Sequence, residues 1–284
     1  MGPQWGKARA TCPTCNEVLA ASYCPECGER ALHPHDLTLR GLLKQVFQTF
    51  TSVDGPLLRS FRCLVTRPGL LTVAYLRGQR KPYTLPLQLF LVANVLFFAM
   101  QSFTGAKLFS TPLNQHLQSD IWGGVAQQLV GHRLEMRRTP MDLYAPVFDH
   151  AVEVNAKSLI AVMVLPFALL PTVVFYRSRR PFVAHIVFSL HFYTFLLLLL
   201  CISLATVGIV QLFGGPGLES ENFDHALSIV ELGVCAVYLY IAAGAVYGAR
   251  GVVRMITLLP LVAAVAGIYL GYRFALLLIT LYST

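Results

Sequence analysis

The sequence predicts an all-α integral membrane protein, built as a helical bundle with about five transmembrane helices. Of the 284 residues, 55% are hydrophobic and only 13% are charged, whereas a soluble domain usually carries about 25% charged residues. The hydrophobic residues gather in long continuous runs, and a helix that crosses the bilayer core needs roughly 20 of them. Because these runs do not alternate with polar residues, helices rather than β-barrel strands are expected to cross the membrane.

The chain divides into three regions along its length. Residues 1–37 form a polar, cysteine-rich head, and residues 38–84 form a basic, amphipathic segment. The bundle occupies residues 85–284, and its apolar runs lie at about 85–103, 158–176, 182–213, 226–247 and 255–282. The third run is long for a single span, so a break at Gly208 would add a sixth span and reverse the side on which the C-terminus lies.

The distribution of basic residues predicts the orientation. With the N-terminus inside, most of the 22 Lys and Arg residues fall in the inner segments 1–84, 177–181 and 248–254, and the outer loop 214–225 has none. The positive-inside rule therefore predicts a bacterial inner-membrane protein with a cytoplasmic N-terminus and an outer C-terminus. The N-terminal residues also lack the apolar core of a signal peptide. The net charge of +8 is then explained by basic residues that orient the helices and attract anionic lipid headgroups, rather than by nucleic-acid binding.

Two matched cysteine turns predict a metal site in the head. Cys12 and Cys15 form one Cys-x-x-Cys turn, and Cys24 and Cys27 form another. Four thiolates arranged in this way suit a closed, structural Zn²⁺ site with no open position for catalysis. The alternatives are rubredoxin-like iron, a redox pair and disulfides. Reducing conditions in the cytoplasm disfavour disulfides, and the paired spacing favours a metal.

The segment that precedes the first span is predicted to form amphipathic helices on the cytoplasmic face. One helix starts near Thr38, the chain turns at 54–55, and Gly78 ends the last helix. These helices are expected either to lie in the membrane interface or to pack against the bundle. Four basic residues are expected to anchor this segment to headgroups or to its own loops, namely Arg67, Arg77, Arg80 and Lys81.

The largest outer segment is the loop 104–157. Leu113, Leu117, Ile121 and Val125 recur every four residues, which predicts an amphipathic helix. The loop has no Gly-rich phosphate-binding sequence and no nucleophile motif, so a surface cap is expected rather than a catalytic domain.

Three motifs carry a resemblance to a known family. Arg67-Pro68-Gly69 is followed by Tyr75-x-x-Gly78-x-Arg80-x-x-Tyr83-x-x-Pro86, and later by His185-x-x-Phe188-Ser189-Leu190-His191. Together with the cysteine head, these motifs resemble the bacterial membrane-protein family catalogued as domain of unknown function 3667. The resemblance implies a membrane protein with a zinc ribbon, and it implies no established activity.

Polar residues inside the predicted spans are candidates for function, because ionisable groups are costly at membrane depth. Glu231 and Arg273 lie at similar depth and are expected to form an ion pair, either joining two helices or binding an ion or an anionic substrate. His185 and His191 are six residues apart and so face different sides of one helix. Each is expected to serve in packing, proton transfer or metal or haem ligation. Asn94 is expected to join helices and to neighbour His191.

These features favour a non-enzymatic scaffold, assembly or sensor protein whose ribbon binds a cytoplasmic partner. The alternative is a transporter or lipid-handling protein with a polar site inside the membrane. An intramembrane enzyme is disfavoured, because the chain lacks the His-Glu-x-x-His and Gly-x-Ser-x-Gly motifs. The sequence predicts neither a substrate nor an oligomeric state.

Overall fold

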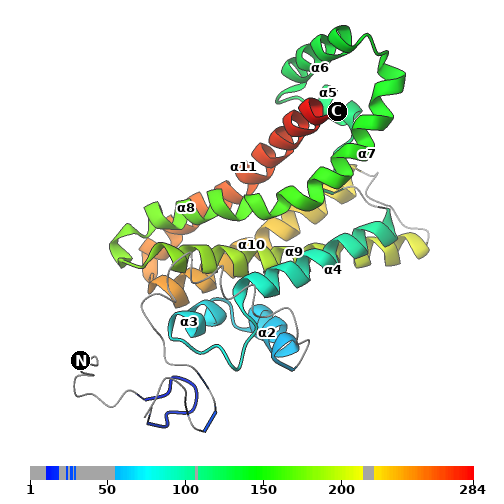
Figure 1. Cartoon of the computed structure of the whole chain (residues 1–284). Coiled ribbons are helices and arrows are strands. Elements are labelled where there is room, and N and C mark those ends of the chain that lie inside the picture. Colours follow the sequence, from blue (N-terminus) through cyan, green and yellow to red (C-terminus); the bar gives the residue numbers. More distant parts are fainter. Residues whose placement is uncertain are drawn as a thin grey trace, which may run out of the picture.

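The structure is a computed structural model that describes residues 11–18, 24, 26, 27, 29, 55–105, 108–213 and 221–284. The regular elements in these residues are helices, which confirms the all-helical prediction (Figure 1). Four of them are long and apolar enough to cross a membrane: α4 (Pro86–Thr104), α9 (Phe182–Leu212), the part Ala226–Tyr247 of α10 (Glu221–Tyr247), and α11 (Gly251–Ser283).

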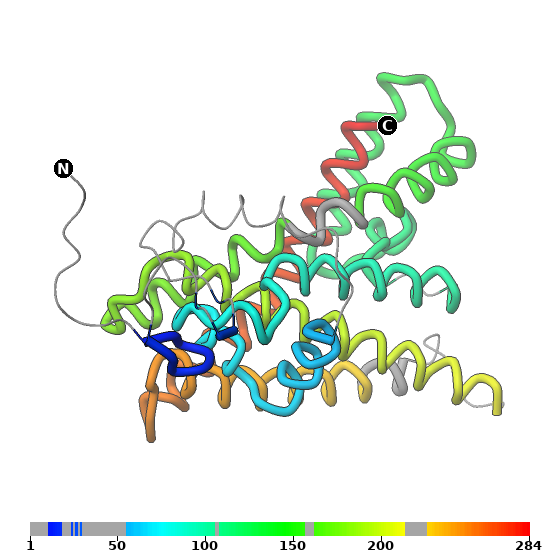
Figure 2. The backbone as a smooth tube through the Cα atoms, turned by 60° about the horizontal axis from the view of Figure 1, so that its bottom comes forward, coloured from blue at the N-terminus to red at the C-terminus, as the bar shows by residue number. Residues whose placement is uncertain are grey.

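The central element is α9, an unbroken helix of 31 residues. The break considered at Gly208 is therefore absent. Every side chain from Val183 to Phe195 is buried, because α3, α4, α8 and α10 all pack against this helix (Figures 1 and 2). A helix that is apolar on all sides is expected at such a central position.

The second apolar run is not the single continuous helix that was predicted. A 3-10 turn, η2 (Ile160–Met163), separates α7 (Met141–Leu159) from α8 (Val164–Val174), and a second turn, η3 (Tyr176–Ser178), follows. Pro166 explains the break, because proline lacks an N–H group and clashes with the carbonyl four residues earlier. With 11 residues, α8 is shorter than the roughly 20 that a span needs. It still packs on α9 and returns the chain to the end of the bundle where α9 begins (Figure 1).

The short helices α2 (Gly55–Thr66) and α3 (Leu70–Leu76) pack against the bundle, while their place relative to the membrane interface stays a prediction. Leu64 of α2 and Tyr75 of α3 are buried, and the two helices contact α4, α9 and α10. The helix predicted to start near Thr38 lies outside the described residues.

A glycine cap ends α3 and sets the path of the chain toward α4. Gly78 adopts a positive φ of 85°. Its N–H group donates to the carbonyl of Tyr75 at 3.0 Å, while the N–H group of Gln79 donates to that of Ala74 at 2.9 Å. This pair of bonds is a Schellman motif, and Pro86 then begins α4 at a position where its missing N–H group costs nothing.

The outer segment forms a layer of three helices, α5 (Leu113–Leu117), α6 (Gly123–Arg137) and α7, packed around the C-terminal end of α11 (Figure 1). At about 1.5 Å per residue, α11 exceeds the thickness of a bilayer core and so reaches this layer. The hydroxyl of Tyr144 lies 2.8 Å from that of Thr284, and the Tyr272 hydroxyl donates to the carbonyl of Ala156 at 3.1 Å.

The prediction of one helix from the four-residue repeat of residues 113–125 is wrong. Ile121 and Val125 are 68% and 50% exposed, and the chain turns between α5 and α6. Trp122 enters the core instead, and its ring N–H donates to Nδ1 of His116 at 3.3 Å. Burial, assisted by the nearby charge of Arg273, lowers the pKa of His116 to about 4, so this imidazole is neutral at pH 7 and can accept the bond.

Gly69 is the point at which the α2–α3 pair meets α10, and its replacement tests that packing. A Cβ atom on Gly69 would lie 2.9 Å from the backbone oxygen of Ala242 and 2.9 Å from the Cβ of Ala245, and the φ of Gly69 is +84°. We expect Gly69→Ala to destabilise the protein by about 2 to 4 kcal/mol, since backbone strain adds to overpacking. Thermal unfolding of the detergent-purified protein measures this as a lower melting temperature.

Two other glycines separate strain from overpacking. Gly55→Ala places a methyl group in open space, and Gly105→Ala does so at a φ of +67°. We expect little change from the first and about 1 kcal/mol of destabilisation from the second. A melting temperature of Gly69→Ala equal to that of the wild type would contradict the packing of this turn on α10.

Candidate metal centre and intramembrane cavity

We call the described residues of the cysteine-rich head, 11–18, 24, 26, 27 and 29, the ribbon. Its two cysteine turns have the same backbone geometry. The N–H group of Cys12 donates to the carbonyl of Glu17 at 2.7 Å, and that of Cys24 donates to the carbonyl of Glu29 at 2.7 Å. Asn16 follows the first turn with a φ of 65°, a left-handed conformation that asparagine tolerates. Such turns direct the paired sulfur atoms toward one point.

All four cysteine sulfur atoms lie within 4.8 Å of one another. Sγ of Cys12 is 3.5 Å from Sγ of Cys27, and Sγ of Cys15 is 3.4 Å from Sγ of Cys24. All four are free cysteines in this structure, as the metal alternative requires. Tetrahedral thiolates bound at about 2.3 Å would lie about 3.8 Å apart, and the cluster is compatible with one metal ion.

The two histidines of α9 bind different helices. Nδ1 of His191 lies 2.8 Å from the hydroxyl of Thr72 on α3, and Nδ1 of His185 lies 2.9 Å from that of Tyr247 on α10. Both side chains are buried. Each bond joins α9 to a neighbour, which favours the packing alternative for both residues. The hydrogen-bond partner of His191 is Thr72. Asn94 is half-buried on α4, and its place beside His191 stays a prediction.

A cavity of about 330 Å³ lies between α9, α10 and α11. Glu231 of α10 and Arg273 of α11 both line it, so the structure brings these residues to one site, while their direct ion pair stays a prediction. The Arg273 guanidinium also lies 5.8 Å from the ring centre of Trp122 and 5.9 Å from that of Tyr269. Such contacts attract a cation to the face of an aromatic ring.

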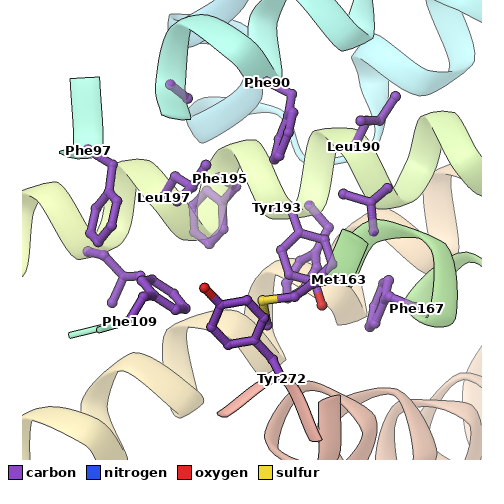
Figure 3. Close-up of a cluster of buried hydrophobic side chains, with 14 of the residues drawn as sticks. Phe90, Phe97, Phe109, Met163, Phe167, Leu190, Tyr193, Phe195, Leu197 and Tyr272 are labelled. Atoms are coloured by element: carbon purple, nitrogen blue, oxygen red, sulfur yellow. The ribbon is translucent and has the colours of Figure 1, made fainter. Parts of the chain in front are cut away.

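Tyr193 lines the same cavity from α9. It lies on the side of the helix that faces Met163 and Tyr272, whereas Phe90 of α4 packs on the opposite side (Figure 3). Among the described residues, its buried hydroxyl has no hydrogen-bond partner, and neither has the buried Nε of Arg273. Buried donors of this kind are uncommon in proteins.

A buried carboxylate joins the ribbon to the bundle. Glu29 is 2% exposed, and its Oε2 accepts hydrogen bonds from the backbone N–H groups of Arg80 at 3.0 Å and Lys81 at 2.9 Å. The hydroxyl of Thr14 donates to the same oxygen at 2.9 Å. We call these three bonds the Glu29 link. They fix the ribbon beside the turn that joins α3 to α4 (Figures 1 and 2).

The basic residues of this turn differ in exposure. The guanidinium of Arg80 lies 5.3 Å from the ring centre of Tyr75 and is half-buried, so Arg80 anchors its own loop. Arg67, Arg77 and Lys81 are exposed and remain available to headgroups.

Residues 54–98 match the family model described as Protein of unknown function (DUF3667). This match confirms the family resemblance over that segment. No curated protein and no solved structure matches the chain. The DUF3667 segment comprises α2, α3 and most of α4, and it includes both residues whose backbone the Glu29 link holds.

Nothing in the sequence singled out Glu29. It is one of 14 acidic residues, and its partners in the DUF3667 segment are 51 and 52 residues away. The only local signal is its position two residues after Cys27. That position does not by itself predict burial, because Glu17 stands two residues after Cys15 and is exposed.

The comparison between Glu29 and Glu17 provides a test of the link. We expect Glu29→Ala to keep its metal and to accelerate hydrogen exchange at the N–H groups of Arg80 and Lys81 by about tenfold. A hydrogen bond to a charged group contributes about 1.5 to 3 kcal/mol, and exchange read by mass spectrometry on the segment 79–85 reports its loss. Glu17→Ala should leave this exchange unchanged. Equal exchange in Glu29→Ala and the wild type would rule the link out.

Proposed function

We propose that this protein is a non-enzymatic scaffold, assembly or sensor protein of a bacterial inner membrane, in which the ribbon binds a cytoplasmic protein partner. The Glu29 link is the observation that carries the proposal. A buried carboxylate with three donors holds the ribbon in one orientation against the DUF3667 segment. A docking surface that is fixed in advance loses less entropy when a partner binds.

Zn²⁺ is the metal that we propose for the ribbon. Four thiolates form the closed tetrahedral set of structural zinc sites, which leaves no position for a substrate. The donor set therefore favours a role in folding and partner binding. Because so short a segment has little core of its own, the metal supplies much of its folding energy.

In this proposal the ribbon and the α5–α7 layer lie on opposite sides of the membrane. The concentration of Lys and Arg in the segments on the ribbon side supports a cytoplasmic ribbon, as does the need for reduced thiols. Exposed Arg67, Arg77 and Lys81 then face anionic headgroups, each with an attraction of about 1 kcal/mol. Val18 is 40% exposed on the ribbon and offers an apolar contact for a protein.

Metal content and site-specific crosslinking in cells test the proposal together. We expect one zinc ion per chain, and a photoreactive residue at Val18 should crosslink a cytoplasmic protein. Cys15→Ser should reduce both zinc content and crosslink by about tenfold, because three thiolates bind the ion less tightly than four.

The control is Cys201→Ser, which removes a buried cysteine of α9 far from the ribbon in sequence and should retain both signals. A Cys15→Ser chain that lost its zinc and kept the crosslink would refute a metal-dependent docking surface. If the metal analysis finds iron in place of zinc, the proposed metal is wrong but the docking proposal is unaffected.

A further inference from the structure

The cavity between α9, α10 and α11 lies toward the α5–α7 layer. Its lining includes the second half of α9 from Leu196 to Val207, the first half of α10 and residues of α11 up to Arg273. Leu108 and Phe109, which follow α4, complete this side. In the proposed orientation, the cavity therefore sits at the level of the outer leaflet.

Two residues that line this cavity carry a buried donor without a partner in the described part of the chain. The Tyr193 hydroxyl and Nε of Arg273 have no hydrogen-bond partner among the described residues, and Tyr193 is only 2% exposed. A buried polar group without a partner costs about 1 to 3 kcal/mol. An anionic oxygen placed in the cavity would satisfy both groups, and phosphate is a strong partner for an arginine.

Glu231 adds the opposite charge to the same wall. A ligand with negative charge alone would be attracted by Arg273 and repelled by Glu231, and both forces are strong where water is scarce. A zwitterion meets both groups favourably. A carboxylate offers about four acceptor sites, so Glu231 can accept from an ammonium group in addition to its contacts within the bundle. The hydroxyls of Ser203 and Ser228 are further neutral partners on the lining.

The remaining wall is largely apolar and continues to the outside of the bundle. Leu232 lines the cavity and is 41% exposed, and Ser228 is exposed one turn away. In a bilayer this surface faces acyl chains. A volume of about 330 Å³ equals roughly ten water molecules at about 30 Å³ each, which suits a headgroup and leaves the chains in the membrane.

We propose that this cavity binds a zwitterion carrying a phosphate and an ammonium group, presented as the head of a membrane phospholipid. The phosphate lies at Arg273 and Tyr193, and the ammonium lies at Glu231. This inference is independent of the ribbon and its partner. It assigns the intramembrane site to lipid recognition.

Binding of defined lipids to the full-length protein tests the inference. Native mass spectrometry of the detergent-purified chain should show at least tenfold tighter binding of phosphatidylethanolamine than of phosphatidylglycerol, which has the phosphate and lacks the ammonium. Glu231→Gln should abolish this preference. Tyr193→Phe should weaken both lipids by about tenfold, since it removes one hydrogen bond to a charged group.

Matched controls separate binding from folding. Tyr238→Phe removes the hydroxyl of another buried tyrosine that does not line the cavity, and Asp142→Asn neutralises an exposed carboxylate of α7. Both should bind lipid as the wild type does, and no variant should melt at a lower temperature than the wild type. If free phosphoethanolamine at the same concentration displaces phosphatidylethanolamine, the zwitterion site is supported and its ligand is a soluble molecule rather than a lipid.

Equal affinity of the wild type for the two lipids would overturn the proposal. So would an unchanged preference in a folded Glu231→Gln variant.

Discussion

The burial of α9 on all its sides is the constraint on which the rest of the structure depends. A helix apolar around its whole circumference needs neighbours in every direction, and α3, α4, α8 and α10 supply them. Hydrogen bonds fix the register of this packing. The Thr72 hydroxyl lies 2.8 Å from Nδ1 of His191, and the Tyr247 hydroxyl lies 2.9 Å from Nδ1 of His185. The histidines thus select which turn of each neighbour lies against α9.

The position of the ribbon follows from the same packing. Once α3 is seated on α9, its glycine cap directs residues 79–81 outward, where the two N–H groups reach the carboxylate of Glu29. The ribbon in turn depends on its cysteine cluster, because the carbonyl of Glu29 closes the second turn. The cysteine cluster, the DUF3667 segment and the central helix therefore form one continuous chain of contacts, while the cavity lies on the other side of α9 from α4.

Local patterns in the sequence predicted the features that depend on local chemistry. The spacing of Cys12, Cys15, Cys24 and Cys27 predicted their cluster, because each turn is closed by bonds within six residues. The cap at Gly78 was predicted for the same reason. The apolar runs predicted four helices correctly, since bilayer thickness sets their length.

Features that depend on contacts between distant residues were missed. The Glu29 link joins residues about 50 positions apart, and no local pattern pairs the cysteine turn at one end with the Gly78–Lys81 segment at the other. Trp122 replaces Ile121 in the outer core because its ring fits beside His116 and Arg273, which no periodicity encodes. Pro166 marks the break in the second run, but an apolar run of spanning length predicts one helix whether or not a proline interrupts it.

The central claim is that α9 crosses the membrane and separates the ribbon side from the α5–α7 layer. Single cysteines at exposed Gln128 of α6 and exposed Arg177 of η3 report the two sides, with the wild-type chain as background. An impermeant maleimide applied to intact cells should label Gln128→Cys at once, and Arg177→Cys only after the membrane is opened. Labelling of Arg177→Cys in intact cells would contradict the account.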